Sequence, residues 1–378
     1  MNTTIPDTYC AIRRSGPAPT EGSPQTYKIT TEKTLPSGSL SSHDVLLKII
    51  AVSLNYRDAL MLHGQYPSGN SPDGIPGSDC VAVVAAIGTS VTKFKVGDRV
   101  SPAFDIEDLH GERPIDGKLG LGSYEDGVLR EYAIYNEQVL VHVPKHLSWE
   151  EAATIGCAGI TAWTSLSFPS LYLSGRPKTV LLQGTGGVSV FALVLCLATP
   201  NITPIITSSS DAKLSALRTK LSKSFPGKQF LSYNYRTYPD QSSKISELTQ
   251  GKGVDLIINN AGPASIPADI ASLSGRNGQV SLVGFLGGWE AGPGGWDPAG
   301  IFGGLMMKTA RIQGMAVGSK DDLEDLNKFI EERKIKLDAL VDDKKVWRIE
   351  ESAEAVEWLW RGEHLGKVVV RVANGDDV

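Results

Sequence analysis

Residues 178–198 read Lys178-Thr-Val-Leu-Leu-Gln-Gly-Thr-Gly-Gly-Val-Ser-Val-Phe-Ala-Leu-Val-Leu-Cys-Leu-Ala198, and this stretch decides the fold. Its first part, residues 179–183, is a short apolar run with the β-branched residues that strands favour. Residues 184–187 include three glycines, and apolar residues then recur at helical spacing from Val188 onward. The stretch therefore predicts a strand, a tight turn and a buried helix, the first βα unit of a nucleotide-binding fold.

The turn has the composition of a phosphate-binding loop. A pyrophosphate can lie on a helix N-terminus only where no Cβ atom keeps the backbone away. We expect Gly184 to make the turn and Gly186 or Gly187 to admit the phosphates. Ser189 stands where the G-x-G-x-x-G motif has its third glycine, so the motif by itself also fits a glycine-rich turn that binds nothing. The loop residues assigned to cofactor binding are Gly184, Thr185, Gly186, Gly187 and Val188.

The second apolar run, residues 204–207, ends where a dinucleotide fold usually holds an acid for the ribose hydroxyls. Here hydroxyl residues continue from Thr207 to Ser210, and Asp211 and Lys213 follow. Hydroxyl groups and a nearby cation suit a 2′-phosphate, which an acid at the strand end would repel. We therefore favour NADP(H) over NAD(H), bound by Ser208, Ser209 and Lys213. Asp211 could instead cap the next helix, or it could bind the ribose hydroxyls of a cofactor without the 2′-phosphate.

The composition is that of an ordinary globular protein, with room for two domains in 378 residues. A formal net charge of −5 gives no electrostatic reason to expect nucleic acid or an anionic membrane as a partner. The longest apolar run, residues 190–198, is too short to span a bilayer. Residues 1–14 lack the apolar core of a signal peptide, so we expect a cytoplasmic protein. The four cysteines are scattered, which argues against a disulfide framework and a C-x-x-C zinc site.

Strand and helix patterns divide the chain into two parts. Residues 45–54 and 80–87 read as strands, and a run of strands before a βαβ pattern predicts an antiparallel, barrel-like domain ahead of a parallel-sheet domain. From about Ser148 strands and helices alternate, which predicts a doubly wound α/β sheet with its site at the carboxyl ends of the strands. The last strand, residues 367–372, is expected to return to the first domain. The expected domains are residues 1–158 with 318–378, and residues 159–317.

Six stretches, in order along nearly the whole chain, carry a family resemblance. The stretches are Ser53-Leu-Asn-Tyr-Arg-Asp58, Gly77-Ser-Asp-Cys-Val-Ala-Val-Val-Ala-Ala-Ile-Gly88, Lys95-Val-Gly-Asp-Arg-Val100, Gly156-Cys-Ala-Gly-Ile-Thr-Ala-Trp163, Gly184-Thr-Gly-Gly-Val-Ser189 and Gly366-Lys-Val-Val-Val370. They resemble the medium-chain dehydrogenase/reductase superfamily, and more closely its zinc-free branch of quinone-oxidoreductase-like and zinc-type-alcohol-dehydrogenase-like proteins. The resemblance implies a GroES-like catalytic domain and a Rossmann domain that binds NADP(H).

The same resemblance argues against zinc. Zinc-dependent members bind the catalytic metal through Cys, His and Cys, and the matching positions here are Asn55, Ser78 and Cys157. A single thiol cannot supply the three protein ligands of a catalytic zinc. The lobe that carries four cysteines for a structural zinc in such relatives matches residues 105–127, which contain none. We therefore expect no metal.

The resemblance also implies the chemistry. The zinc-free branch typically transfers hydride from NADPH to the β-carbon of an enone or to a quinone, and we expect a small or mid-sized apolar carbonyl compound as the substrate. Two alternatives stay open: an NADP(H)-dependent alcohol dehydrogenase or ketone reductase, and a non-redox enzyme or binding protein that keeps the nucleotide site. The family usually forms homodimers through the last strand of the nucleotide domain, matched here by residues 312–317.

Three residues are the catalytic candidates, Asn55, Tyr56 and Asp58. Tyr56 could donate a proton or a hydrogen bond to the substrate oxygen, or it could simply pack. Asn55 could bind the substrate carbonyl or the cofactor amide, or it could be a structural turn residue. Asp58 fits an orienting role better than direct catalysis. Cys157 is a candidate substrate contact whose alternative is a small buried core residue.

The remaining candidates surround the cofactor. Tyr235 matches a family tyrosine near the adenosine phosphate, and Lys367 resembles a lysine that reaches the cofactor; each could instead be an ordinary surface residue. Phe285 and Trp289 are also expected to touch the substrate, since a glycine-rich loop with Trp289, Trp296 and Phe302 could form an aromatic lid or a dimer contact. The further cofactor candidates are Thr161, Asn260, Gly284, Phe285 and Leu286.

Overall fold

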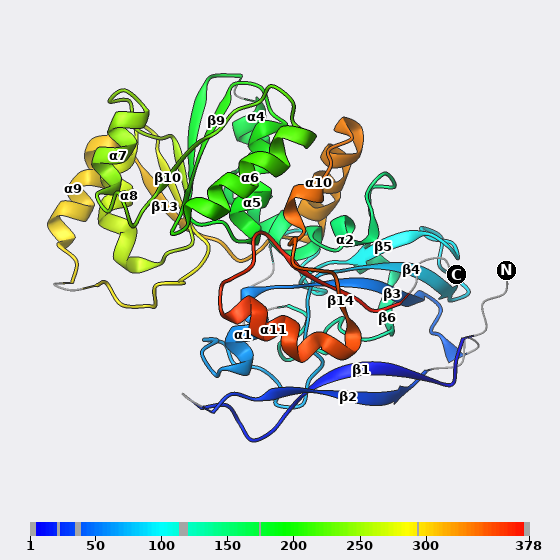
Figure 1. Ribbon diagram of the computed structural model, residues 1–378. Helices are drawn as coiled ribbons and strands as arrows, with labels where there is room; N and C mark the ends of the chain where they lie inside the picture. The colour runs from blue at the N-terminus through cyan, green and yellow to red at the C-terminus, as the bar shows by residue number, and fades with distance from the viewer. Residues whose placement is uncertain are drawn as a thin grey trace. The chain divides into compact units, whose positions relative to one another are not determined.

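A computed structural model describes residues 5–20, 23–34, 39–112, 120–173, 175–292 and 295–373 (Figure 1). The chain forms two compact units, one made of Met1–Ile160 with Gly318–Val378 and one made of Thr161–Val317. Each unit has its own hydrophobic core. Residues 105–127 match the structural-zinc lobe of zinc-dependent relatives, and of these residues 113–119 lie outside the described part of the chain.

The first unit is built from antiparallel strands. β1 (Thr8–Ser15) pairs with β2 (Thr26–Lys33), and a seven-stranded sheet has the order β14-β15-β3-β4-β5-β7, with β6 also paired to β3. The long central strand β3 is almost entirely buried because both of its faces are covered. The strands of this sheet are β3 (Asp44–Leu54), β4 (Cys80–Ile87), β5 (Arg99–Pro102), β6 (Tyr132–Asn136), β7 (Leu140–His142), β14 (Trp347–Arg348) and β15 (Val368–Arg371).

The end of the chain completes this sheet. β15 runs antiparallel to β3, and Val368 lies opposite Leu54. Lys367 therefore comes to lie beside the end of β3, where Asn55 begins the next helix. The short helices of this unit are α1 (Tyr56–Leu62), η2 (Glu137–Val139), α2 (Trp149–Ala152), the π-helix η3 (Ile155–Gly159), α10 (Lys320–Arg333), η5 (Asp338–Leu340), η6 (Ile349–Glu351) and α11 (Ser352–Trp360).

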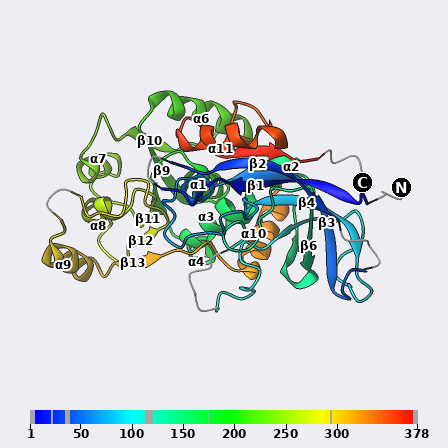
Figure 2. The same cartoon turned by 90° about the horizontal axis from the view of Figure 1, so that it is seen from below.

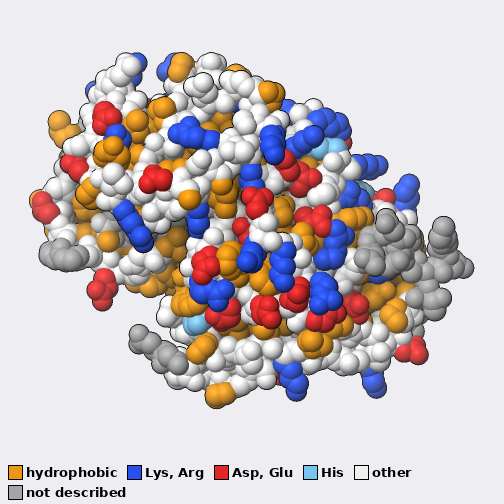
Figure 3. All heavy atoms as spheres, viewed as in Figure 1, with side chains coloured by type: hydrophobic (Ala, Val, Ile, Leu, Met, Phe, Trp, Pro, Cys, Tyr) orange, Lys and Arg blue, Asp and Glu red, His pale blue; other side chains and the backbone are white. Residues whose placement is uncertain are grey.

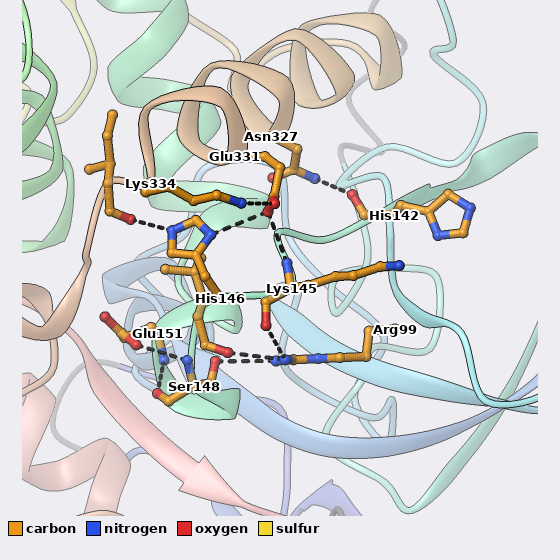
Figure 4. A network of polar contacts seen from close by, with 11 residues as sticks. Arg99, His142, Lys145, His146, Ser148, Glu151, Asn327, Glu331 and Lys334 are labelled. Atoms are coloured by element: carbon orange, nitrogen blue, oxygen red, sulfur yellow. Dashed lines mark hydrogen bonds and ion pairs between the residues drawn. The ribbon is translucent and has the colours of Figure 1, made fainter.

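Polar contacts tie α10 to the segment that leads into α2 (Figure 4). Glu331 accepts hydrogen bonds from the Lys145 amide at 3.0 Å and from His146 Nδ1 at 3.2 Å. Asn327 donates to the His142 carbonyl oxygen at 2.9 Å. Ser148 caps α2 through the amide of Glu151 at 3.1 Å. These bonds fix the approach to η3, the helix that carries Cys157.

The second unit has a six-stranded parallel sheet in the order β10-β9-β8-β11-β12-β13. This order reverses at β8, as in a doubly wound dinucleotide-binding fold, so the ligand site is expected beyond the carboxyl ends of β8, β9 and β11. The predicted fold class is confirmed. The strands are β8 (Lys178–Leu182), β9 (Ile202–Ser208), β10 (Leu231–Asn234), β11 (Leu256–Asn259), β12 (Gln279–Leu282) and β13 (Arg311–Gly314).

Helices alternate with these strands. α5 is buried from Ser189 to Leu197, as its nearly continuous apolar sequence predicts. α9 contacts α8, and both views show the two helices side by side (Figures 1 and 2). Within the described residues no helix is long and apolar enough to cross a bilayer. The helices are α3 (Ile160–Ser165), α4 (Phe168–Leu173), α5 (Gly187–Leu197), α6 (Asp211–Ser224), α7 (Gln241–Leu248), η4 (Pro263–Ser265), α8 (Ile266–Ser272) and α9 (Pro298–Lys308).

Candidate functional site

The loop after β8 leaves open space at the start of α5. Gly184 has a φ of +82°, which side chains rarely adopt, and a Cβ atom at Gly184 or Gly186 would meet nothing within 4 Å. Gly186 is the N-cap of α5, and no side chain caps the helix there. The first amides of α5 are thus available to a ligand. Open space and free amides at a helix N-terminus fit the pyrophosphate of a dinucleotide.

Ser189 explains the departure from the glycine motif. Its hydroxyl donates to the Gln183 carbonyl oxygen at 2.7 Å and accepts from the Asn260 side-chain amide at 3.0 Å. Asn260 also donates to the Gln183 carbonyl oxygen at 3.3 Å. A hydroxyl at this position therefore links the ends of β8 and β11, which a glycine could not do.

The residues expected at the adenosine ribose meet at the ends of β9 and β10. Ser210 caps α6 by accepting from the Lys213 amide at 3.3 Å, and the Ser208 hydroxyl accepts from the Ser210 amide at 3.2 Å. Ser209 is half-buried beside them. The Tyr235 amide donates to the Ser208 carbonyl oxygen at 3.0 Å, which brings Tyr235 to this corner with its side chain exposed.

Two neighbours change the balance of charge at this corner. The Asp211 carboxylate accepts from the Asn234 side-chain amide at 3.0 Å, so this acid is held toward β10. Arg236, an exposed cation directly after Tyr235, was not among the sequence candidates. The sequence pair Tyr235-Arg236, directly after the β10 segment, is the signal that could have identified Arg236.

The ends of β11 and β12 carry the remaining cofactor candidates. Asn260 accepts the Leu286 amide through its backbone carbonyl at 3.0 Å, and half-buried Gly284 precedes Phe285 in the same segment. The ring of Phe285 stacks on Trp289 at 4.1 Å, and the side chain of Trp289 is exposed. Thr161 is buried on α3 in the same unit.

A buried carboxylate that the sequence reasoning missed organises this region. Asp269 accepts from Gln183 at 2.8 Å, from Gln241 at 2.7 Å and from Asn259 at 2.6 Å. Burial raises the pKa of the Asp269 carboxyl to about 6, although these hydrogen bonds act to lower it. The network links β8 and β11 to α7 and α8. The Asn259 side-chain amide is used in this network.

In the first unit, α1 presents the catalytic candidates. Asp58 is fully buried, and its carboxylate accepts from the Asn55 amide at 2.8 Å and from the Gly77 amide at 3.2 Å. Both oxygens of Asp58 accept backbone amides, which favours the orienting role over direct catalysis. Asp58 instead fixes the start of α1 and so the position of Asn55.

Tyr56 stands at the first position of α1 and is half-buried. Its ring stacks on Trp360 of α11 with centroids 5.7 Å apart, and His63 stacks on the same tryptophan at 3.9 Å. Burial raises the pKa of the Tyr56 hydroxyl, which keeps it protonated. Among the described residues this hydroxyl has no hydrogen-bond partner.

The positions that match zinc ligands have a donor set unsuited to zinc. Asn55 is an amide, and the Ser78 hydroxyl is buried with no hydrogen-bond partner in the described structure. Burial, reinforced by nearby Asp79, raises the pKa of the Cys157 thiol to about 12, so this group is not a thiolate. The described residues contain no cluster of three or more His, Cys, Asp or Glu side chains that could hold a metal ion.

Lys367, a candidate for cofactor binding, contacts groups of the first unit. Its side chain is 3% exposed, and its ammonium group donates to the Leu54 carbonyl oxygen at 2.9 Å and to Asn55 Oδ1. It also forms an ion pair with Asp79 Oδ2 at 3.3 Å. Two hydrogen-bond acceptors and one carboxylate of the first unit therefore surround the ammonium. This lysine is committed to the first unit.

Comparison with known proteins agrees with the architecture. Residues 41–145 match the family model described as alcohol dehydrogenase GroES-like domain, and residues 187–332 match the one described as zinc-binding dehydrogenase. The zinc-type alcohol dehydrogenase-like protein C1773.06c of Schizosaccharomyces pombe is 36% identical, covering 88% of this chain and 92% of its own length.

Two further similarities extend over most of the chain. The 2-methylene-furan-3-one reductase of Solanum lycopersicum is 25% identical, covering 92% of this chain and 76% of its own. A solved structure from Sinorhizobium meliloti 1021, assigned as an alcohol dehydrogenase, is 32% identical with a TM-score of 0.83 and covers 98% of this chain and 100% of that one.

Proposed function

Because this chain belongs to the medium-chain dehydrogenase/reductase superfamily, whose members are oxidoreductases that bind nicotinamide cofactors, we propose that it is a zinc-independent, NADPH-dependent reductase. Its substrate is an enone or quinone of small to medium size and apolar character. The observation that carries this proposal is the donor set of the first unit. Asn55 and Ser78 stand where a catalytic zinc would need a thiolate and an imidazole, and Tyr56, next to Asn55, offers a further hydrogen-bond donor.

The chemistry divides between the two units. The second unit would hold the cofactor at the N-terminus of α5, and the bound cofactor would supply a hydride for the β-carbon of the enone. The π electrons of the C=C bond then form a double bond between the α-carbon and the carbonyl carbon, and the π electrons of the C=O bond move onto the oxygen, which becomes an enolate oxygen. The Asn55 side-chain amide and the Tyr56 hydroxyl donate hydrogen bonds to this oxygen and stabilise its charge. A proton, passed through Tyr56 or from water, then completes the saturated carbonyl product at the α-carbon.

The preference for NADPH rests on the corner formed by β9 and β10. Ser209 and Lys213 bring a hydroxyl and a cation to this corner, and the hydroxyl of buried Ser208 accepts the Ser210 amide. Tyr235 and Arg236 add an exposed ring and a second cation. The one acid of the corner, Asp211, is engaged by Asn234. Tryptophan fluorescence titration with NADPH and NADH tests this preference. Equal affinities, or tighter binding of NADH, would remove the preference for the phosphorylated cofactor.

The second candidate function is reduction of a ketone or aldehyde to an alcohol. The likeness to proteins assigned as alcohol dehydrogenases favours it. An α,β-unsaturated aldehyde distinguishes the two reactions, because C=C reduction gives a saturated aldehyde and C=O reduction gives an allylic alcohol. If the protein does not consume NADPH with any enone, quinone or aldehyde, both redox functions fail. The chain would then be a non-redox enzyme or a binding protein that keeps the nucleotide site.

We also propose a homodimer formed through β13 and α9. β13 is the edge strand of the parallel sheet, and its residues Arg311, Gln313 and Gly314 are exposed. On α9 the side chains of Phe302, Met306 and Met307 are 65%, 80% and 84% exposed. Hydrophobic side chains are visible at the surface where α9 lies (Figure 3). An exposed edge beside an apolar helix face suits pairing with a second copy.

A further inference from the structure

A buried ion pair lies directly behind the proposed substrate donor. Lys367 and Asp79 are 2% and 0% exposed, and the Lys367 ammonium reaches Asn55 Oδ1, Asp79 Oδ2 and the Leu54 carbonyl oxygen. The antiparallel register of β15 on β3 places Lys367 beside Asn55. This position is therefore set by the sheet and not by a flexible loop.

The ammonium is the charged group among those that orient the Asn55 amide; the Ser53 carbonyl oxygen and the capping box of α1 favour the same orientation. A side-chain amide can present either an acceptor oxygen or two N–H donors, and its hydrogen-bond partners decide between the two orientations. An ammonium group only donates, so it must face the amide oxygen. The Asn55 Nδ2 group then points elsewhere, and its recorded contact, with the Ser53 carbonyl oxygen at 3.4 Å, uses at most one of two N–H groups.

We propose that Lys367 is a positioning residue that fixes the Asn55 side-chain amide with an N–H group free for the carbonyl oxygen of the substrate. Asp79 balances the buried charge of the lysine. In the opposite orientation the amide oxygen would face the substrate oxygen, and two acceptors would repel each other as negative charge develops. This inference rests on the proposed function, in which that oxygen becomes an enolate.

The orientation of the amide can be observed without any reaction. In protein labelled with ¹⁵N-asparagine, the Asn55 side-chain resonances are those lost in the Asn55→Asp variant. Lys367→Met should split or broaden these resonances, because the amide then samples both orientations. Lys28→Met, which removes an exposed lysine from β2, is the matched control and should leave them unchanged. Unchanged Asn55 resonances in Lys367→Met would overturn the proposal, whether or not the protein reduces any substrate.

The kinetic test asks whether the lysine acts through the asparagine. Asn55→Ala should lower kcat/KM for an enone about 100-fold, and Lys367→Met at least about tenfold, with the Kd for NADPH unchanged. The double variant should be no slower than Asn55→Ala, because a lysine that acts through Asn55 has nothing left to position. Losses that multiply in the double variant would contradict the proposal.

The lysine variant leaves a buried carboxylate without its partner and could fail to fold. Replacing both charges, as Lys367→Met with Asp79→Leu, removes this problem and should give the same split amide resonances. If the wild-type protein consumes no NADPH with any enone, quinone or aldehyde, the proposed function fails. The resonance test still decides the role of Lys367 in that case.

Discussion

The ring of Tyr56 is held by Trp360, while its hydroxyl has no partner within the described structure. A fixed ring with a free, protonated hydroxyl is well placed to donate a hydrogen bond or a proton. Tyr56→Phe keeps the ring and its stacking but removes the donor. We expect kcat for an enone to fall about 100-fold, with an unchanged Kd for NADPH, as measured by steady-state kinetics and fluorescence titration.

The control for this variant is Tyr124→Phe, which removes the hydroxyl of an exposed tyrosine of the same unit and should leave kcat unchanged. If Tyr56→Phe retains full activity, Tyr56 only packs against Trp360, and water or another group must supply the proton.

The buried carboxyl of Asp269 should make the stability of the protein depend on pH. Its pKa is raised from 3.8 to about 6. Between these values the folded state binds more protons than the unfolded state, so stability is lost as pH rises through this window. A shift of about two units corresponds to about 3 kcal/mol. The free energy of unfolding of the wild type should therefore fall by about 3 kcal/mol relative to Asp269→Asn between about pH 4 and pH 7.

Urea unfolding of both proteins across this range measures the difference. The control is Asp240→Asn, because Asp240 is an exposed helix cap whose pKa is lowered to about 2. The stabilising effect of Asp240 is lost only when pH falls below about 4. The difference in the free energy of unfolding between Asp240→Asn and the wild type should therefore not change with pH above about pH 5. A flat difference for Asp269→Asn as well would show that its carboxyl has an ordinary pKa in the folded protein.

The sequence identified candidate positions, but it did not identify the partners of their side chains. Asn55 and Tyr56 were identified from a local motif, but the roles of Asp58 and Lys367 depend on partners that folding brings from elsewhere. Lys367 is 312 residues away from Asn55 along the chain. Asp269 lies within α8 and acquires its role only when Gln183, Gln241 and Asn259 converge on it.

The loop between β8 and α5 is the proposed binding site of the cofactor pyrophosphate. Gly186 has no positive φ, and a Cβ atom added to it meets only open space. An alanine there should therefore fold without strain, while its methyl group occupies the space assigned to the pyrophosphate. Gly186→Ala should leave the free energy of unfolding within about 0.5 kcal/mol of wild type. It should weaken NADPH binding at least about tenfold in a fluorescence titration.

Gly275→Ala is the matched control, because it also adds a methyl group in open space but lies away from the loop. It should change neither stability nor binding. If Gly186→Ala binds NADPH like the wild type, the phosphates do not lie on the α5 N-terminus.

Elements with a strong repeating pattern were predictable, and weakly patterned ones were not. The β8–α5 stretch carries its strand, turn and helix signals within 21 residues. The segment before Gly304 was predicted as a loop because glycines lower helix propensity, yet residues 298–308 form α9. Asp297 caps this helix through the amides of Ala299 and Gly300, and Pro298 follows at its first turn. An acid before a proline was the start signal that outweighed the glycines.

At the scale of the whole molecule, the interrupted first unit could be predicted because a strand pattern reappears after the last helix. Residues 367–372 carry that pattern, and β15 pairs with β3 in the first unit. The exposed face of α9 could not be predicted in the same way, because which side of a helix stays uncovered depends on the packing of all its neighbours.

If α9 and β13 form the dimer contact, charge on the apolar face should separate the two copies. Met306→Glu with Met307→Glu places two carboxylates in an interface that has to bury apolar area. Light scattering should give about twice 40.4 kDa for the wild type and 40.4 kDa for the variant. Val96→Glu, which adds the same charge to another exposed apolar residue, should remain a dimer. A monomeric wild type would remove the dimer proposal, and a dimeric methionine variant would assign the contact to another surface.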